Sequence, residues 1–463
     1  MTLRTQPRRR WSCGLILIFC LLPTLAGAQP ELAFKFRLGS LLQQESAGSE
    51  AGERDRAELF SDLYGGALLP FSRHWRGYVR GQGFISTGEI FLSEEETPQR
   101  TEGFLALREA WVEYRGLNSY PGDVLRLGRQ RLRAYDGLWW DEDIESLQWI
   151  VERTTLRGRL ALAAPLATAR SDSAEIPIGQ RQRRYLAGDL AWSYRRGHAI
   201  GIRGTLAADH GELRRSMDPN ENRTRQRRQA WLGVYLDSQY HDYRADHQLA
   251  YWAELVGLIG EQKRLLNPGG SAPLRRTRED LLGSSADLGL RWHPLQGPLR
   301  LGFGYAVGSG GRDDGDVSRQ FEQTGLHSNR SRFTGTRTIL YRFNEALQPD
   351  LENLSIASTF VALQLPRIDA SLLAHQLWRR TAETRIVTRG LDTAPGNAGN
   401  EIGRGYDLIL SWYFDELTTQ PLFFEDTAAN LRLRLSRFEP GQAYTGTGAT
   451  TLNRGTVEAT VYF

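Results

Sequence analysis

The sequence predicts an all-β fold, a transmembrane antiparallel up-and-down β-barrel of about 16 to 18 strands with short periplasmic turns and long extracellular loops. Three observations support this prediction. Apolar and polar residues alternate along most of the chain, which is the period of a β-strand. Tight turns and long polar connections separate the alternating runs, as on the two rims of such a barrel. The chain ends on TVEATVYF, an amphipathic strand pattern whose last residue is aromatic.

Residues 1–28 have the pattern of a cleaved secretory signal peptide. Three arginines at 8–10 precede the apolar run CGLILIFCLLPTLAGA, which closes on small residues at 26–28. The run is short for a bilayer span, so a single-pass anchor is the weaker alternative. The arginines also suggest twin-arginine export, but the residues that usually follow them are missing. We therefore expect residues 29–463 to form a single outer-membrane β-barrel domain.

Cysteine content and charge exclude several classes of site. Both cysteines, Cys13 and Cys20, lie in the signal peptide, so the remaining chain can form no disulfide, zinc–thiolate site or cysteine nucleophile. The whole chain has 58 basic and 54 acidic residues, and four arginines leave with the signal, so 54 basic residues remain. The overall charge gives no reason to expect nucleic acid binding.

Alternation is clearest in LRLRLSRF, where Leu431, Leu433 and Leu435 alternate with Arg432 and Arg434. Helical periodicity is nowhere sustained, and no stretch after residue 28 reaches the roughly 18 apolar residues of a membrane helix. Secreted β-sandwiches and solenoids alternate similarly and are the competing folds. Seven tryptophans are candidates for interfacial girdles or for cross-strand packing: Trp139, Trp140, Trp231, Trp252, Trp292, Trp378 and Trp412.

The connections between the runs fall into two classes. The tight ones are rich in turn residues and include 195–199, 293–298 and 366–369. The long polar ones are 218–228, 259–282, 308–333 and 388–405. This division favours the membrane barrel over the competing folds.

The segment LRLGRQRLR (125–133) sets three arginines two residues apart. In a β-strand, Arg129, Arg131 and Arg133 would therefore share one face. A solvated surface strand is the simpler interpretation of this segment alone. In a barrel, the polar face looks into the lumen, where a low-dielectric wall strengthens the potential of these groups. The pattern then predicts a lumen that attracts anions.

Other charged residues fit the same interpretation. Arg432 and Arg434 would add to the positive lumen, and Arg108 stands beside Glu109. Acidic residues just after the first three arginines would hold the guanidinium groups in place, or merely solvate a loop: Asp141, Glu142, Asp143 and Glu145.

Five longer segments occur in the order of a known family: LREAWVEYRGL (107–117), SYPGDVLRLGRQRLRAYDGLWWDEDIESLQW (119–149), GSGGRDDG (308–315), FEQTGLHSNRSRFTGTRTILYRFNEAL (321–347) and RFEPGQAYTG (437–446). They resemble the alginate-export outer-membrane family, and the second and fourth segments are long and specific. The resemblance implies a monomeric barrel of about 18 strands that passes a polyuronate through an arginine-rich constriction, with long loops and periplasmic turns acting as gates.

The resemblance also implies constriction residues. Its arginines correspond to Arg108, Arg129 or Arg131, Arg330, and Arg432 or Arg434, and its acidic partners to Glu109, Asp141 and Asp172. Two positions depart from the family. Segment 62–70 has no arginine, although Arg73 is near, and Ile339 stands where the family has arginine. Arg337 and Arg332 are the candidate substitutes.

The predicted function is passive export of an anionic exopolysaccharide, without bond chemistry or a cofactor. The implied partners are the polysaccharide cargo, outer-membrane lipid, a periplasmic tetratricopeptide-repeat scaffold and an inner-membrane polymerase complex, with no nucleic acid. An anion-selective porin for small acidic solutes would need the same arginines. A barrel hydrolase would need a Ser–His pair with an orienting group, and none of the eight histidines lies in a recognised hydrolase motif.

A metal site has little support in the sequence. Asp313, Asp314 and Asp316 match part of a calcium-loop pattern, without the glutamate that would complete it. A solvated acidic loop is the preferred interpretation.

Overall fold

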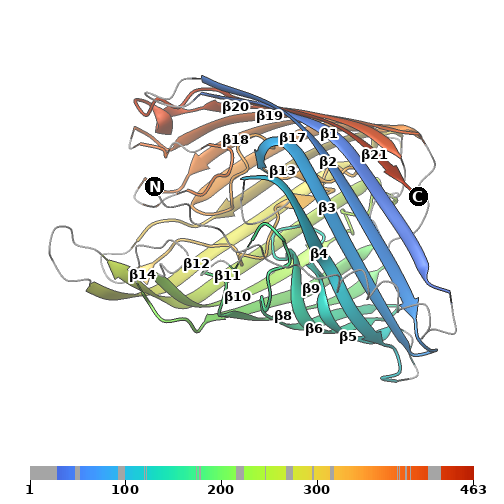
Figure 1. Ribbon diagram of the computed structural model, residues 1–463. Coiled ribbons are helices and arrows are strands. Elements are labelled where there is room, and N and C mark those ends of the chain that lie inside the picture. Colours follow the sequence, from blue (N-terminus) through green and yellow to red (C-terminus); the bar gives the residue numbers. More distant parts are fainter. Residues whose placement is uncertain are drawn as a thin grey trace, which may run out of the picture.

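The chain forms a closed β-barrel in the computed structural model (Figure 1). The structure describes residues 29–46, 53–91, 100–118, 120, 122–173, 175–176, 179–214, 224–245, 247–266, 275–294, 297–312, 317–382, 384, 386–391, 394–396, 398–414 and 429–463. The predicted signal peptide, residues 1–28, lies outside these residues, as do Asp313, Asp314 and Asp316.

Eighteen strands form the barrel wall, and neighbours pair antiparallel, which confirms the predicted fold. β1 closes the barrel by pairing with both β2 and β21. The wall strands are β1 (Glu31–Ser46), β2 (Glu53–Pro70), β3 (Trp75–Phe91), β4 (Arg100–Tyr114), β5 (Asp123–Arg133), β6 (Asp141–Glu152), β7 (Leu156–Ala163), β8 (Arg183–Arg195), β9 (His198–Asp209), β10 (Arg225–Asp237), β11 (Leu249–Leu266), β12 (Arg275–Trp292), β13 (Leu299–Gly308), β17 (Leu354–Gln364), β18 (Ile368–Arg379), β19 (Glu401–Tyr413), β20 (Asn430–Pro440) and β21 (Leu452–Tyr462).

The wall is apolar outside and polar inside, as strand alternation predicts. On β1, Leu32, Phe34 and Leu38 are exposed on the outer surface, whereas Arg37 is buried on the lumen side. Leucines and other large apolar residues are exposed on most other wall strands. No helix in the described part of the chain is long and apolar enough to cross a membrane.

The tryptophans divide between the two faces. Trp292, Trp378 and Trp412 are exposed outside, which fits an interfacial position. Trp139, Trp140, Trp231 and Trp252 are buried instead, so the predicted girdle does not include them. The indole N–H of Trp139 donates to Glu254 (2.8 Å) and that of Trp140 to Thr205 (2.8 Å), which explains how these rings are held inside.

The two rims differ in the length of their connections. Phe34 and Phe463 exchange backbone hydrogen bonds, so both ends of the described chain lie at one rim. That rim has mostly short connections, including 71–74, 153–155, 196–197 and 365–367, although 238–248 and 414–429 are longer than expected. The opposite rim has the long ones, including 164–182, 309–353 and 380–400. The terminal rim is thus the periplasmic one.

One predicted loop is wrong. Segment 259–282 consists mainly of the paired outer ends of β11 and β12, joined by 267–274. Its charged residues suggested a loop, but these strands extend beyond the apolar band, where both faces can be polar.

Strands β5 and β6 leave the wall halfway along their length. β4 pairs with β5 only between Ala110–Arg129 and Tyr114–Leu125. Farther from the periplasmic rim, β4 bonds instead to the segment after β7, where the Leu107 amide donates to the Ala169 carbonyl (2.8 Å). Gly128 lies at the departure point with a φ of 131°, which strongly favours glycine.

The outer half of the β5–β6 hairpin, residues 129–145, therefore lies inside the barrel. Its Leu132 and Ile144 pack in the buried cluster that contains the inward-facing Tyr185 and Trp231. The opposite face of the hairpin carries Arg129 and the other two arginines of its segment. Nearer the periplasmic rim, the same face of β5 is part of the outer surface of the barrel, and Leu127 on it is 63% exposed.

The long connection 309–353 also enters the lumen. It contains the short strands β14 (Val317–Ser318), β15 (Arg330–Ser331) and β16 (Leu340–Tyr341), and most of its side chains from 321 onward are buried. Nη2 of Arg342 donates to both carboxylate oxygens of Asp287 of β12 (2.8 Å each). Arg337 forms an ion pair with Asp369 of β18 (2.7 Å). Buried ion pairs therefore attach this inner segment to the wall.

Candidate functional site

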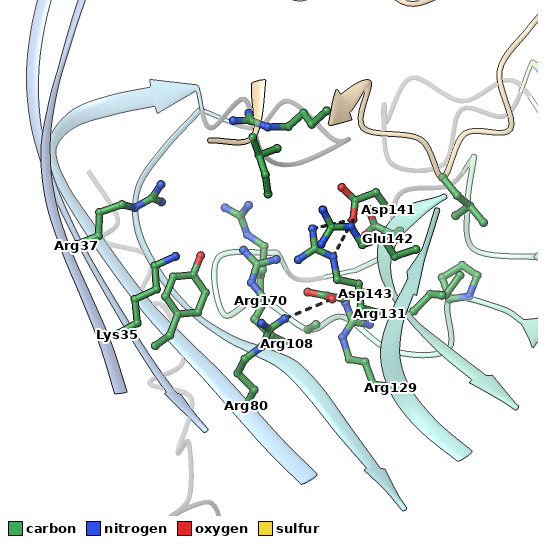
Figure 2. Close-up of a pocket in the computed structure, with 18 of the residues that line it drawn as sticks. Lys35, Arg37, Arg80, Arg108, Arg129, Arg131, Asp141, Glu142, Asp143 and Arg170 are labelled. Atoms are coloured by element: carbon green, nitrogen blue, oxygen red, sulfur yellow. Dashed lines mark hydrogen bonds and ion pairs between the residues drawn. The ribbon is translucent and has the colours of Figure 1, made fainter. Parts of the chain in front are cut away.

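A cavity of about 320 Å³ in the lumen has a strongly cationic lining. β1 to β6, β8, β20, β21, the inner segment and the segment after β7 contribute to it. Its described lining contains eleven basic side chains, Lys35, Arg37, Arg80, Arg108, Arg129, Arg131, Arg133, Arg170, Arg330, Arg432 and Arg434. The acidic ones are Asp141, Glu142, Asp143 and Glu458. Figure 2 shows Lys35 and Arg37 on one side of this cavity and Arg129 and Arg131 on the other.

A bulge in β4 brings Arg108 and Glu109 into the lumen together. Arg80 of β3 pairs with Glu109, and the next residue, Gly81, pairs with Leu107, so Arg108 is skipped. Such a bulge reorients a side chain that strict alternation would place on the other face. The Arg108 guanidinium donates to Gln82 (2.5 Å), while Glu109 accepts from Arg80 (2.9 Å).

The three hairpin arginines face carboxylates on the neighbouring strand β6. Arg129 pairs with Glu145 (2.7 Å) and Arg131 with Asp141 (2.7 Å). Arg133 lies 3.6 Å from the same Asp141 carboxylate. Because β5 and β6 pair in regular register, each arginine has an acidic residue opposite it, and the residues at 141–145 orient the guanidinium groups.

The opposite side of the cavity is built by β1, β20 and β21. Arg37 pairs with Asp62 (2.6 Å) and lies 3.7 Å from Glu458, which in turn lies 4.0 Å from Arg432. Arg434 forms an ion pair with Glu345 of the inner segment. Arg434 also donates to the Ile339 carbonyl (2.9 Å).

The inner segment contributes the last part of the lining. Arg330 and Ile339 both line the cavity, so an apolar side chain stands among the basic ones. Burial opposes ionisation of Glu345, but Arg434 and Arg330 more than offset that effect and hold its pKa below the usual range. The Glu345 carboxylate therefore stays charged and fixes the inner segment against β20.

Five predicted residues lie outside the lining: Glu109, Glu145, Asp172, Arg332 and Arg337. Glu109 is buried just behind it, paired with Arg80. Asp172 pairs with Arg170 (2.6 Å), and Arg170 is the one that lines the cavity. Arg337 is turned away, because Asp369 and two backbone carbonyls at the periplasmic turn bind its guanidinium.

Four basic residues of the lining were not predicted: Lys35, Arg37, Arg80 and Arg170. Lys35 and Arg37 alternate with outward-facing Phe34 and Leu38, so the period-2 pattern contained a signal for them. The sequence contained no such signal for Arg170, because this residue lies in a connection without periodicity. Its guanidinium stacks 3.9 Å from the centre of the Phe104 ring.

Another group has the composition of a hydrolase triad. His375 lies between Ser358 (2.8 Å) and Asp407 (3.0 Å), and all three are buried. Asp407 also accepts hydrogen bonds from Asn344 of the inner segment (2.9 Å) and from Ser436. This group attaches the inner segment to the wall, and none of its members lines the cavity. Among the described residues there is no cluster of metal-ligating side chains.

Comparisons with solved structures place the fold among outer-membrane porins. OccAB1 of Acinetobacter baumannii superposes with a TM-score of 0.56, covering 95% of this chain and 97% of its own, at 10% identity. OccK2 of Pseudomonas aeruginosa gives a TM-score of 0.53, covering 94% and 98% of the two chains, at 12% identity. These likenesses show the fold, a closed β-barrel of the porin type.

Sequence comparisons give the family. The alginate production protein AlgE of Pseudomonas aeruginosa is 35% identical over 405 residues, covering 83% of this chain and 82% of the relative. AlgE of Pseudomonas syringae pv. tomato is 30% identical over 472 residues, covering 92% and 93%. The family described as alginate export matches residues 31–458, and this chain belongs to that family.

Proposed function

We propose that the protein is a passive channel that exports an anionic exopolysaccharide, an alginate-like polyuronate, through an arginine-lined constriction in its lumen. The observation that carries this proposal is the lining of the lumen cavity, with eleven basic and four acidic side chains. Family membership supports the cargo class, since the matching relatives are alginate production proteins.

The chemistry of the lining suits a polymer with a carboxylate on each sugar. A guanidinium group binds a carboxylate through two parallel hydrogen bonds and stays protonated at any physiological pH. Most of these arginines already hold a protein carboxylate, as in Arg131–Asp141 and Arg80–Glu109. A passing uronate would therefore exchange with an existing partner, which keeps each contact weak enough for the chain to move on.

In this proposal Arg108, Arg129, Arg131, Arg330, Arg432 and Arg434 form the narrowest part, with Lys35, Arg37, Arg80, Arg133 and Arg170 extending the same surface. Glu109 and Asp141 hold the guanidinium groups, and Asp172 orients Arg170. No bond is made or broken, and the lining residues described include no histidine that could act as a base. Synthesis would drive the polymer, so a periplasmic scaffold and an inner-membrane polymerase are the proposed partners.

Ion selectivity and polymer block in a planar bilayer test the proposal. The protein without its first 28 residues should carry an anion-selective current that a polyuronate blocks and a neutral glucan does not. Replacing Arg129 and Arg131 by alanine should weaken both selectivity and block, roughly ten-fold for the block. The matched control replaces Arg404 and Arg437, two arginines on the outer surface of β19 and β20 with 60% and 55% exposed side chains.

The outcomes separate the candidate functions. Anion-selective current that is indifferent to polyuronate would point to a porin for small acidic solutes. Cation-selective current would contradict both, because it would mean that the acidic residues dominate the conducting path.

A further inference from the structure

The outer surface of β7 to β11 carries an apolar groove. Two adjoining hollows of about 520 and 590 Å³ share Leu186, Leu206 and Ile259 in their linings. These side chains stand on the lipid-facing side, with Leu206 52% and Ile259 59% exposed. The groove therefore opens to the membrane and is separate from the lumen cavity.

Strand register explains why the surface is hollow there. Outward-facing positions on neighbouring strands form rows, and in one row Gly188 lies beside Gly204. The same row continues through Leu232 to Gly257. Glycine leaves a gap in a surface that leucine and isoleucine otherwise fill, so the missing side chains shape the groove.

Two arginines close one end of the groove. Ala208 pairs with Arg184 on one side and with Arg228 on the other, so the two arginines flank a small residue in one row. At the usual strand spacing, their backbones are about 10 Å apart. The Arg228 side chain is 63% exposed. Its guanidinium lies 3.7 Å from the Glu261 carboxylate, which is too far for a hydrogen bond. Within the described part of the chain, Arg184 has no ion-pair or hydrogen-bond partner for its side chain.

The arginine end lies at the outer edge of the membrane. Trp192 is on the outer face of β8 near the periplasmic rim and is 55% exposed, and Arg184 lies eight positions before it. Eight residues of strand extend about 27 Å, which is roughly 20 Å in height for a tilted barrel strand. The apolar band of such barrels is about 25 Å tall. Arg184 therefore lies within about 5 Å of the outer edge of this band. The strand register agrees, because the outward row that contains Leu206 and Ile259 is followed by a row with Arg184, Arg228 and Glu261. Long arginine side chains at this edge extend to the headgroups of the outer leaflet.

We propose that this groove binds an acyl chain of a phosphorylated glycolipid of the outer leaflet, with Arg184 and Arg228 binding its phosphate. Guanidinium groups at a lipid boundary are stabilised by an anionic headgroup, and they bind phosphate oxygens in pairs. An apolar groove below two poorly compensated cations matches a ligand with a fatty chain below an anionic head. The inference does not depend on which polymer passes through the lumen.

Native mass spectrometry of the purified barrel with added lipid A tests the proposal. The wild-type protein should retain bisphosphorylated lipid A at least ten-fold more strongly than dephosphorylated lipid A or phosphatidylcholine. The double variant Arg184→Ala with Arg228→Ala should lose that preference. The matched control, Arg404→Ala with Arg437→Ala, removes two outer-surface arginines that already lie near glutamates, and it should keep the preference.

A second variant tests the groove without changing its charge. The nearest atom to a Cβ at Gly204 would be the Trp231 carbonyl oxygen at 3.5 Å, an ordinary contact, so Gly204→Leu should fold and fill the groove. It should reduce lipid A retention several-fold with both arginines present. Equal retention of lipid A and phosphatidylcholine by the wild type would overturn the proposal. An equal loss in the two arginine variants would do the same, since it would mean general attraction by surface charge.

Discussion

At the scale of single residues, the lumen depends on arginines that share carboxylates with one another. Asp141 serves both Arg131 and Arg133, and Glu458 lies between Arg37 and Arg432. Such sharing leaves hydrogen-bonding capacity on each guanidinium for a passing anion, since each has five N–H donors. Ile339 interrupts this pattern, because it adds an apolar surface to the lining.

Replacing Ile339 by arginine should make the channel more positive. The new guanidinium would join Arg330 and Arg434 around the same cavity, so the ratio of anion to cation permeability should rise roughly two-fold or more. Reversal potentials in a salt gradient measure this ratio. Ile339→Leu controls for shape and should leave the ratio unchanged. An arginine variant with wild-type selectivity would mean that position 339 does not face the ion path.

The predicted residues Arg108 and Arg129 both line the cavity, although strict alternation along their strands would place them on the lipid side. Counting from outward-facing Leu127, Arg129 falls on the lipid side, and counting from Leu107, Arg108 needs a bulge to face inward. Arg129 is predicted in the lumen from the polar face of its segment and from the family resemblance, but neither the kink at Gly128 nor the β4 bulge has a signal in hydrophobic periodicity. Arg337 shows the opposite case: its sequence position is near the lining, but its Asp369 partner lies on β18, far away in sequence.

At the scale of elements, two structures fill the barrel: the inward half of the β5–β6 hairpin and the inner segment 309–353. The hairpin turns inward at Gly128, where a Cβ would overlap the Ala110 carbonyl oxygen. The inner segment is held by ion pairs to three wall strands, through Arg342, Arg337 and Glu345.

Replacing Gly128 by alanine should destabilise the hairpin. The backbone φ of 131° is unfavourable for a residue with a side chain, at a cost of about 2 kcal/mol before the overlap is counted. Thermal unfolding followed by tryptophan fluorescence should show a lower midpoint, and the anion selectivity should fall as the hairpin arginines move. Gly257→Ala is the control, because a Cβ there meets no atom within 4 Å. Equal midpoints for the two variants would contradict the role of Gly128 as the turning point.

Acid should loosen the inner segment. Arg434 and Arg330 hold the pKa of Glu345 below its usual range, and His327 and Arg389 do the same for Asp350, in both cases against the effect of burial. A carboxyl group with a lowered pKa stabilises the docked state above its ordinary pKa of about 4. That contribution is lost as the pH falls through the lowered pKa.

Single-channel conductance measures this effect. The conductance should rise, with more switching between levels, as the pH falls below about 4. Glu345→Gln should show part of the same change at neutral pH. Glu439→Gln, which removes an exposed partner of Arg437, should not. Conductance independent of pH in the wild type would mean that these ion pairs do not hold the segment.

At the scale of the whole molecule, the barrel architecture follows directly from alternation, connection lengths and the terminal strand. The connection lengths also identified the two rims, whereas chain length gave about 16 to 18 strands and only the family resemblance pointed to about 18. Which tryptophans face lipid was not predictable, because Trp139 and Trp140 lie in the β5–β6 hairpin, and only its tertiary position puts them inside. The path of residues 309–353 was likewise hidden, since its polar composition is that of an external loop. Its partners, such as Asp287 and Asp369, are spread along the chain.

Passage of the polymer itself tests the proposed function most directly. Proteoliposomes loaded with a polyuronate-cleaving lyase would receive uronate oligomers from outside, and the appearance of unsaturated products would report their entry. We predict product formation that depends on the barrel and slows about ten-fold or more in the Arg129→Ala and Arg131→Ala double variant. Neutral oligomers of the same length should enter much more slowly. No product formation above that of empty liposomes, or a rate unaffected by removing both arginines, would contradict export through an arginine-lined lumen.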